Sequence, residues 1–143
     1  MENVMNKHNL GRHEVVAMLQ GRGITPTQQR VEIAQLLFAR PQHLSAEQVL
    51  VQVNGEQHHV SKATVYNTLN LFARTGLVRE VIVDPTKVFY DSNTTPHHHF
   101  YNVDSGELSD VPATGLEISN LPEAPAGTSV AGVDVIIRLR TAE

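Results

Sequence analysis

The chain has 143 residues, no cysteine and a formal net charge of −4 at pH 7. The absence of cysteine excludes disulfides, thiolate zinc sites and cysteine redox switches, so only nitrogen and oxygen atoms can hold a metal. The sequence contains no apolar run of membrane-spanning length and no secretory leader, and we therefore expect a cytoplasmic protein without a membrane partner.

Acidic and basic residues are divided unevenly along the chain. Residues 1–84 contain eight Lys and Arg against seven Asp and Glu, a formal charge of +1, whereas residues 85–143 contain three against eight, a charge of −5. An acidic second half can hide a near-neutral or locally basic first half. The overall charge therefore does not exclude a protein whose first half binds nucleic acid.

Residues 11–75 have the apolar spacing of helices. A short first helix is followed by a second that begins near Pro26, with Thr25 or Thr27 as its N-cap, and that stops before Pro41. Proline is favoured at the first helical position, and a threonine side chain can cap the free backbone N–H groups.

Two further helices are predicted before residue 76. Ser45 and Gln48 stand three residues apart and match a capping box, which marks a helix start. Ser61 opens the next helix and Gly76 ends it. Its apolar residues recur at spacings of four and three and form one face: Val65, Leu69 and Phe72.

The opposite face of this helix carries side chains that can contact DNA. We expect six residues to lie there: Lys62, Thr64, Tyr66, Asn67, Asn70 and Arg74. Lys62 and Tyr66 suit phosphates, Arg74 suits the DNA backbone, and the uncharged polar side chains suit base edges. The same pattern is also compatible with a solvated helix face.

After the last helix the apolar period changes from that of a helix to that of strands. Two strand-like runs, 77–83 and 87–90, flank the turn sequence 84–86. The last three of these helices, followed by a hairpin, have the order of a winged helix, and its third helix, which opens at Ser61, would enter the major groove. The sequence thus predicts an α+β protein with a winged-helix DNA-binding domain over 1–84 and a second domain over 85–143.

His97, His98 and His99 form a run of imidazoles in the interior of the chain. In a strand, His97 and His99 would point to one face and His98 to the other. Two imidazoles one strand period apart can chelate a transition metal or supply an axial ligand to haem iron. Asp91 and Asp110 add oxygen donors on either side. The run predicts a metal or haem site, and a polar exposed strand or loop is the alternative.

Several motifs occur in an order typical of one family. TVYNTL stands at 64–69, and the helix start SAE at 45–47 is preceded by His43. FYD follows at 89–91, and GEL stands at 106–108 after the histidine run. Over residues 15–140 the chain resembles the ferric uptake regulator superfamily. The tail, ISNLPEAP at 118–125 and VDVIIRLR at 133–140, resembles its iron response regulator branch.

The resemblance implies a homodimeric transcription regulator with an N-terminal winged helix and a C-terminal α/β dimerisation domain. Its regulatory metal site lies at the hinge between them. Carried over position by position, the ligands are His43, Asp91, His97, His99 and Asp110. Three imidazoles and two carboxylates suit Fe(II), Mn(II) or Zn(II). Because His43 belongs to the DNA-binding half, we expect the metal to set the relative placement of two DNA-reading heads.

Resemblance to the iron response regulator branch implies control of iron and haem genes at promoter DNA, with haem relieving the control. The haem-binding element of that branch corresponds to His97, His98 and His99. Haem and the metal would then compete for the same imidazoles, and we treat haem sensing as a hypothesis.

The chain departs from the superfamily in three respects. The structural zinc site built from two pairs of cysteines is absent. A second metal site is only half represented, by His98 and Glu117. Three prolines interrupt the long dimerisation helix over 111–126: Pro112, Pro122 and Pro125. The final strand, 133–139, is apolar, and we expect it to be buried at the dimer interface.

Three alternatives remain open. A peroxide sensor of the same superfamily would bind iron with Asp110 and oxidise His43 or His97. A zinc sensor would use the same ligands and respond to zinc. Two histidines and one aspartate can also form the facial triad of a non-haem iron oxygenase, but the winged-helix pattern explains the first half better and no catalytic motif is present. We therefore expect a regulator and not an enzyme.

Overall fold

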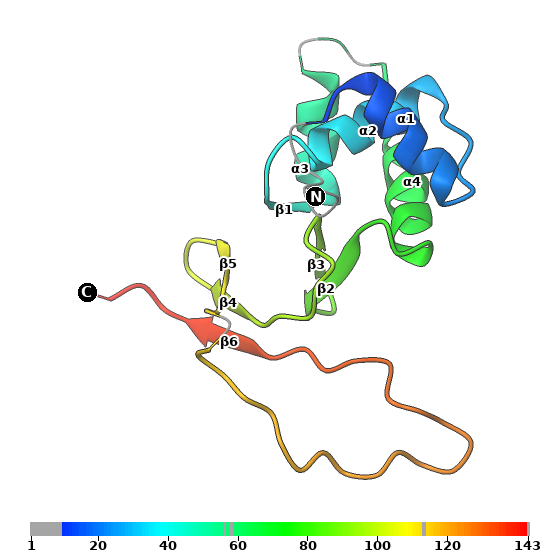
Figure 1. Ribbon diagram of the computed structural model, residues 1–143. Coiled ribbons are helices and arrows are strands. Elements are labelled where there is room, and N and C mark those ends of the chain that lie inside the picture. The colour runs from blue at the N-terminus through cyan, green and yellow to red at the C-terminus, as the bar shows by residue number, and fades with distance from the viewer. Residues whose placement is uncertain (1–9, 56, 58, 113, 143) are drawn as a thin grey trace. The chain divides into compact units, whose positions relative to one another are not determined.

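The computed structural model describes residues 10–142 except 56, 58 and 113 (Figure 1). The chain forms two compact units, Met1–Thr94 and Thr95–Glu143, which we describe one at a time. The division between the units falls after Thr94, whereas the sequence analysis placed the domain boundary after residue 84. The physical reason is that the strand following the hairpin turn pairs with strands of the first unit.

The described part of the first unit contains four helices: α1 (Arg12–Gly21), α2 (Gln28–Leu37), α3 (Ala46–Asn54) and α4 (Lys62–Arg74). The side chains of Thr27, Ser45 and Ser61 cap α2, α3 and α4 by accepting a bond from a backbone N–H three residues on. The side-chain oxygen of Gln48 accepts a hydrogen bond from the Ser45 backbone N–H at 2.8 Å, which confirms the predicted capping box. Of the two candidate caps for α2, Thr27 is the one used.

The apolar faces of these helices pack into the core of the first unit. Its fully buried side chains include Val15, Leu19, Val31, Leu37, Phe38, Val65, Leu69 and Phe72. The last three form the predicted apolar face of α4. Full burial of such a side chain contributes about 1.5–3 kcal/mol to folding. None of the described helices has the length and apolarity needed to cross a membrane.

A small antiparallel sheet completes the first unit. Its strand order is β1-β3-β2, with β1 (His43–Ser45), β2 (Arg79–Asp84) and β3 (Lys87–Asp91). The hairpin β2–β3 was predicted from the sequence. Strand β1 was not, because three residues are too few to display a period of two. It precedes α3 directly and places His43 opposite Asp91.

The second unit contains a sheet of order β5-β4-β6, with β4 (His99–Asn102), β5 (Leu108–Asp110) and β6 (Ile136–Leu139). Strands β4 and β5 pair as an antiparallel hairpin, whereas β6 is parallel to β4. The described residues between β5 and β6 include no helix, and Figure 1 shows this segment as a long excursion from the sheet. The three predicted proline interruptions lie in it.

The final strand is shorter than predicted, because it begins at Ile136 and not at residue 133. Within the single chain it is partly exposed, and its expected burial at a dimer interface stays a prediction. Ile136 and Ile137 are half-buried, and Leu139 is 37% exposed. Among the described residues β6 pairs with β4 alone, so one edge of the strand lacks a neighbour that would cover it.

Candidate metal ligands and nucleic-acid interface

In the first unit, His43 and Asp91 form a pair across the sheet. The antiparallel register of β1 and β3 places the two residues opposite each other, and Nε2 of His43 lies 3.2 Å from Oδ2 of Asp91. Asp91 is buried, and its other oxygen, Oδ1, accepts a hydrogen bond from the Asn93 backbone N–H at 2.9 Å. The loop after β3 therefore fixes the orientation of this carboxylate.

In the second unit, His97, His99 and Asp110 form a compact group. The hairpin register places His99 opposite Asp110, and the Asp110 Oδ1 atom lies 3.3 Å from Nε2 of His97 and 3.5 Å from Nε2 of His99. The two rings stand with centroids 4.4 Å apart. One ligand atom from each residue lies within 4.8 Å of the others.

The donor chemistry of this group fits a divalent transition metal. Nδ1 of His97 lies 2.6 Å from the Thr95 carbonyl oxygen, a contact that places a ring proton on Nδ1. Nε2 is the ring nitrogen that faces Asp110 and could bind an ion. His99 is fully buried. Imidazole nitrogens and a carboxylate oxygen that converge at this distance suit Fe(II), Mn(II) and Zn(II), and each would offer such an ion its Nε2 or Oδ1 atom.

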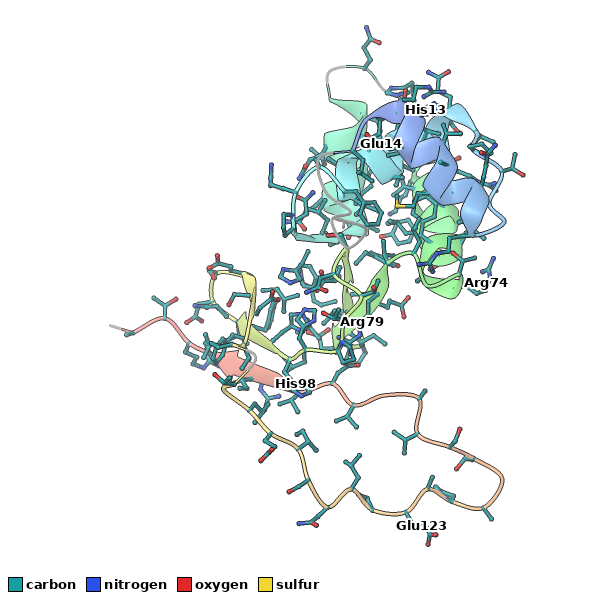
Figure 2. The ribbon with its side chains drawn as sticks, viewed as in Figure 1. His13, Glu14, Arg74, Arg79, His98 and Glu123 are labelled. Atoms are coloured by element: carbon teal, nitrogen blue, oxygen red, sulfur yellow. The ribbon has the colours of Figure 1, made fainter. Side chains whose placement is uncertain are left out.

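The weak second site remains a prediction. Nδ1 of His98 accepts a hydrogen bond from the Val135 backbone N–H at 3.0 Å, so this ring ties the start of β4 to the segment before β6 (Figure 2). Glu117 is exposed in the irregular segment after β5. Neither residue belongs to the ligand group found among the described residues.

The six predicted DNA-contacting residues all lie on α4. Four of them are exposed, namely Lys62, Asn67, Asn70 and Arg74, whereas Thr64 and Tyr66 are half-buried. Figure 2 shows Arg74 at the end of α4, with Arg79 nearby at the start of β2. Both arginines line a cleft of about 590 Å³ together with Asn70. The polar surface of α4 therefore extends to the start of β2.

Sequence reasoning missed two features of this surface. A pocket of about 270 Å³ joins the start of α2, through Thr27, Gln29 and Arg30, to Thr64 and Asn67 of α4. The sequence signal for this pocket was the N-cap Thr27 with a basic residue, Arg30, three positions later. The second feature is Glu47 in the first turn of α3, which accepts a hydrogen bond from the Tyr66 hydroxyl. Nothing in the sequence pattern pointed to that contact.

The link between α3 and α4 is held by polar side chains. The buried Asn54 donates to the Val60 carbonyl at 3.0 Å and accepts from the backbone N–H groups of His59 and Val60 at 3.1 and 2.8 Å. Gln29 of α2 donates to the His59 carbonyl, and Nε2 of His59 lies 2.8 Å from Oε1 of Glu32. These contacts fix where α4 begins.

Comparison with known proteins places the chain in a family. Residues 21–135 match the model of the ferric uptake regulator family. The chain belongs to this family. The peroxide-responsive repressor of Staphylococcus aureus is 30% identical over 97 residues, which are 68% of this chain and 66% of that repressor. The match thus spans just under two thirds of the relative's length.

Solved structures share the fold. The ferric uptake regulator from Pseudomonas aeruginosa, determined with manganese, is 24% identical with a TM-score of 0.63, over 89% of this chain and 97% of that one. The ferric uptake regulator of Vibrio cholerae is 20% identical with a TM-score of 0.67, over 88% and 98%. The mixed α/β architecture of helices and small sheets expected from the sequence is thereby confirmed.

Proposed function

We propose that this member of the ferric uptake regulator family is a metal-responsive transcription regulator. It binds promoter DNA as a homodimer in the cytoplasm, and a bound divalent metal sets its affinity for DNA. The observation that carries the proposal is the convergence of His97, His99 and Asp110, whose ligand atoms lie within 4.8 Å of one another. Family membership supplies the connection between such a group and gene regulation.

The metal is proposed to take its ligands from both units. His97, His99 and Asp110 supply two nitrogens and one oxygen, and His43 and Asp91 supply one more of each. The two sets of ligands are close in sequence, because Asp91 ends β3 only six residues before His97. Because His43 and Asp91 belong to the first unit, the ion would bind more tightly to one placement of the two units than to others. A ligand shifts such an equilibrium by its difference in affinity for the two states.

The first unit is proposed to be a winged-helix DNA-binding domain. Its described elements have the required order, with α4 followed by the hairpin β2–β3. Exposed Asn67 and Asn70 on α4 would read base edges, and Lys62 and Arg74 would contact phosphates.

Replacing Asn67 by Ala should relax sequence preference. Replacing Arg74 by Ala should weaken binding to all duplexes and reduce by about one the slope of log affinity against log salt concentration.

The finer proposal is that the signal is iron or haem status, as the iron response regulator motifs in the tail imply. A second candidate is peroxide sensing through iron, with oxidation of His43 or His97. It is favoured by the 30% identity with a peroxide-responsive repressor. A zinc sensor would use the same five ligands.

A DNA-binding assay separates these functions. Metal-stripped protein is compared with protein given Mn(II), Fe(II) or Zn(II) on duplexes from an iron-gene promoter, with and without haem. Metal-dependent binding that haem abolishes, with a shift of the haem Soret band, supports iron and haem sensing. Peroxide sensing is supported if binding needs iron, is unaffected by haem and is lost after exposure to hydrogen peroxide. Mass spectrometry should then show an added oxygen on a histidine-containing peptide. A response to zinc alone supports a zinc sensor, and binding to no duplex in any state contradicts the proposal.

A further inference from the structure

Tyr66 and Glu47 are joined by a short hydrogen bond at the surface proposed to meet DNA. The phenolic O–H of Tyr66 on α4 donates to Oε2 of Glu47 in the first turn of α3, with 2.5 Å between the oxygens. Glu47 is exposed and Tyr66 is half-buried. A hydroxyl bonded to a carboxylate at this distance is charge-assisted and stronger than a bond between neutral groups.

The direction of the bond is fixed by electrostatics. The hydrogen bond from Tyr66 lowers the pKa of Glu47, and the hydrogen bond to Glu47 raises the pKa of Tyr66. Glu47 is thus ionised at neutral pH and can only accept, whereas Tyr66 keeps its proton and donates it. Nζ of Lys62, one turn earlier on α4, lies 5.8 Å from the centre of the Tyr66 ring.

This bond decides what Tyr66 can offer DNA. A phenol has one donor hydrogen, and here that hydrogen is directed at Glu47, so the remaining lone pairs of the oxygen can only accept. Phosphate oxygens are acceptors and cannot bond to them. In the major groove, the donors are the N6 amino group of adenine and the N4 amino group of cytosine.

We propose that Glu47 is a specificity-determining residue of the DNA interface: by holding the Tyr66 proton, it makes the phenolic oxygen an acceptor for a base amino group. The inference rests on the proposed DNA-binding function. It replaces the sequence-based role of Tyr66 as a phosphate contact. Glu47 acts through Tyr66, so the two residues should be coupled in any measurement of base preference.

Three variants isolate the coupling. Tyr66→Phe removes the acceptor oxygen and keeps the ring. Glu47→Met keeps the length of the side chain but removes the carboxylate that accepts the phenolic hydrogen, so that hydrogen is released. Glu14→Gln is the matched control, because Glu14 is also a first-turn glutamate, its Oε1 accepts from the Gly11 N–H at 2.8 Å, and its replacement changes the net charge equally. Circular dichroism confirms that each variant is folded.

The experiment begins with selection of preferred sequences from randomised duplexes by full-length, metal-loaded protein. The base pair whose preference is lost in Tyr66→Phe is the pair that Tyr66 reads. At that pair, adenine is then replaced by purine, or cytosine by 2-pyrimidinone, each of which lacks only the amino group. We expect wild type and Glu14→Gln to lose several-fold to about tenfold in affinity for the amino-free duplex. Tyr66→Phe should be nearly indifferent to it, and Glu47→Met should lose less affinity than wild type because its phenolic oxygen is no longer restricted to accepting.

Each outcome bears on the inference. Equal losses in wild type and Tyr66→Phe, no Tyr66-dependent base pair, or a Glu47→Met profile identical to wild type would overturn it while leaving sequence-specific DNA binding in place. Failure of the wild-type protein to bind any duplex with metal would overturn the proposed function and the inference together.

Discussion

At the scale of single residues, one carboxylate oxygen of the second unit lies close to two candidate ligand nitrogens. Oδ1 of Asp110 lies within 3.5 Å of the Nε2 atoms of His97 and His99. His99 is fully buried, whereas the Asp110 side chain is 51% exposed. Loss of the His99 ring would leave a cavity, but Asp110 can be altered with little effect on packing. It is therefore the ligand best suited to testing metal binding apart from folding.

Replacing Asp110 by Asn should lower the affinity for Mn(II) or Zn(II) by roughly 100-fold or more, since even the outer-shell partners of metal ligands contribute about 10–100-fold. The melting temperature without metal should change little. Competition titration against a chelating dye measures the affinity. Asp104→Asn is the control, because Asp104 is a half-exposed aspartate of the same unit bonded to the Thr141 N–H. Equal affinity losses in the two variants would contradict the assignment.

The pair formed by His59 and Glu32 should make stability depend on pH. The hydrogen bond to Glu32 raises the pKa of His59. Burial raises the pKa of Glu32, but its bonds to His59 and Gln28 outweigh that effect, and its pKa is lowered. The His59 contribution is complete below about pH 6.5 and is lost as pH rises through the folded-state pKa. The Glu32 contribution is present above about pH 4.5 and is lost as pH falls through its folded-state value.

His59→Gln should therefore lower the melting temperature more at about pH 5.5 than at about pH 8. Thermal denaturation of wild type and variant at both pH values gives the difference, which cancels the titration of other groups. The expected effect is small, because the pair is exposed to solvent. His13→Gln on α1 serves as the control. A difference that grows toward alkaline pH would contradict this account.

At the scale of elements, the placement of α4 depends on the link that precedes it. Asn54, the last residue of α3, makes three side-chain bonds to the backbone of His59 and Val60. Val60 is buried, so its backbone groups would lack water if Asn54 were removed. A helix that reads DNA must start at a fixed position, and this amide provides one reason why it does.

Asn54→Ala should destabilise the first unit by about 2 kcal/mol or more, since each buried polar group left unpaired costs roughly 1–3 kcal/mol. Urea denaturation of the whole protein measures the change. Asn70→Ala is the matched control, because Asn70 is exposed on α4 and its loss should leave stability within about 0.5 kcal/mol. On the proposed function, Asn70→Ala should alter base preference instead. Similar stabilities for the two variants would show that the link does not depend on Asn54.

At the scale of the whole molecule, the core of the first unit is self-contained. Its buried cluster extends from Val15 to Tyr90, and both ends lie within Met1–Thr94. Strand β3 contributes Tyr90 to this cluster, and its Phe89 side chain is also buried. A boundary after residue 84 would remove the central strand of the β1-β3-β2 sheet.

A fragment of residues 1–94 should therefore fold cooperatively, and a fragment of residues 1–84 should not. Loss of one buried aromatic side chain alone costs about 3–5 kcal/mol, a large part of the stability of a small domain. Circular dichroism during heating distinguishes the two fragments, because a cooperative unfolding transition is expected only for the longer one. A cooperative transition in the shorter fragment would instead support a domain boundary after residue 84.

Much of the local structure followed from the sequence alone. Ser45 and Gln48 marked the start of α3, and the spacing of Val65, Leu69 and Phe72 identified the buried face of α4. These features depend on neighbours within a few residues, for which helix geometry fixes the distances. The histidine run likewise predicted that His97 and His99 lie on one face, because side chains two residues apart in an extended chain share a face.

Tertiary structure decided everything that required strands or helices from distant parts of the chain to meet. Strand β1 exists because β3 pairs with it, and that pairing places His43 against Asp91, 48 residues away in sequence. The contact between Tyr66 and Glu47 arises from the packing of α3 against α4, and no periodic pattern encodes it. The β4–β5 register likewise sets His99 opposite Asp110. Local sequence determines which residues share a face, whereas the pairing and packing of elements determine which faces come together.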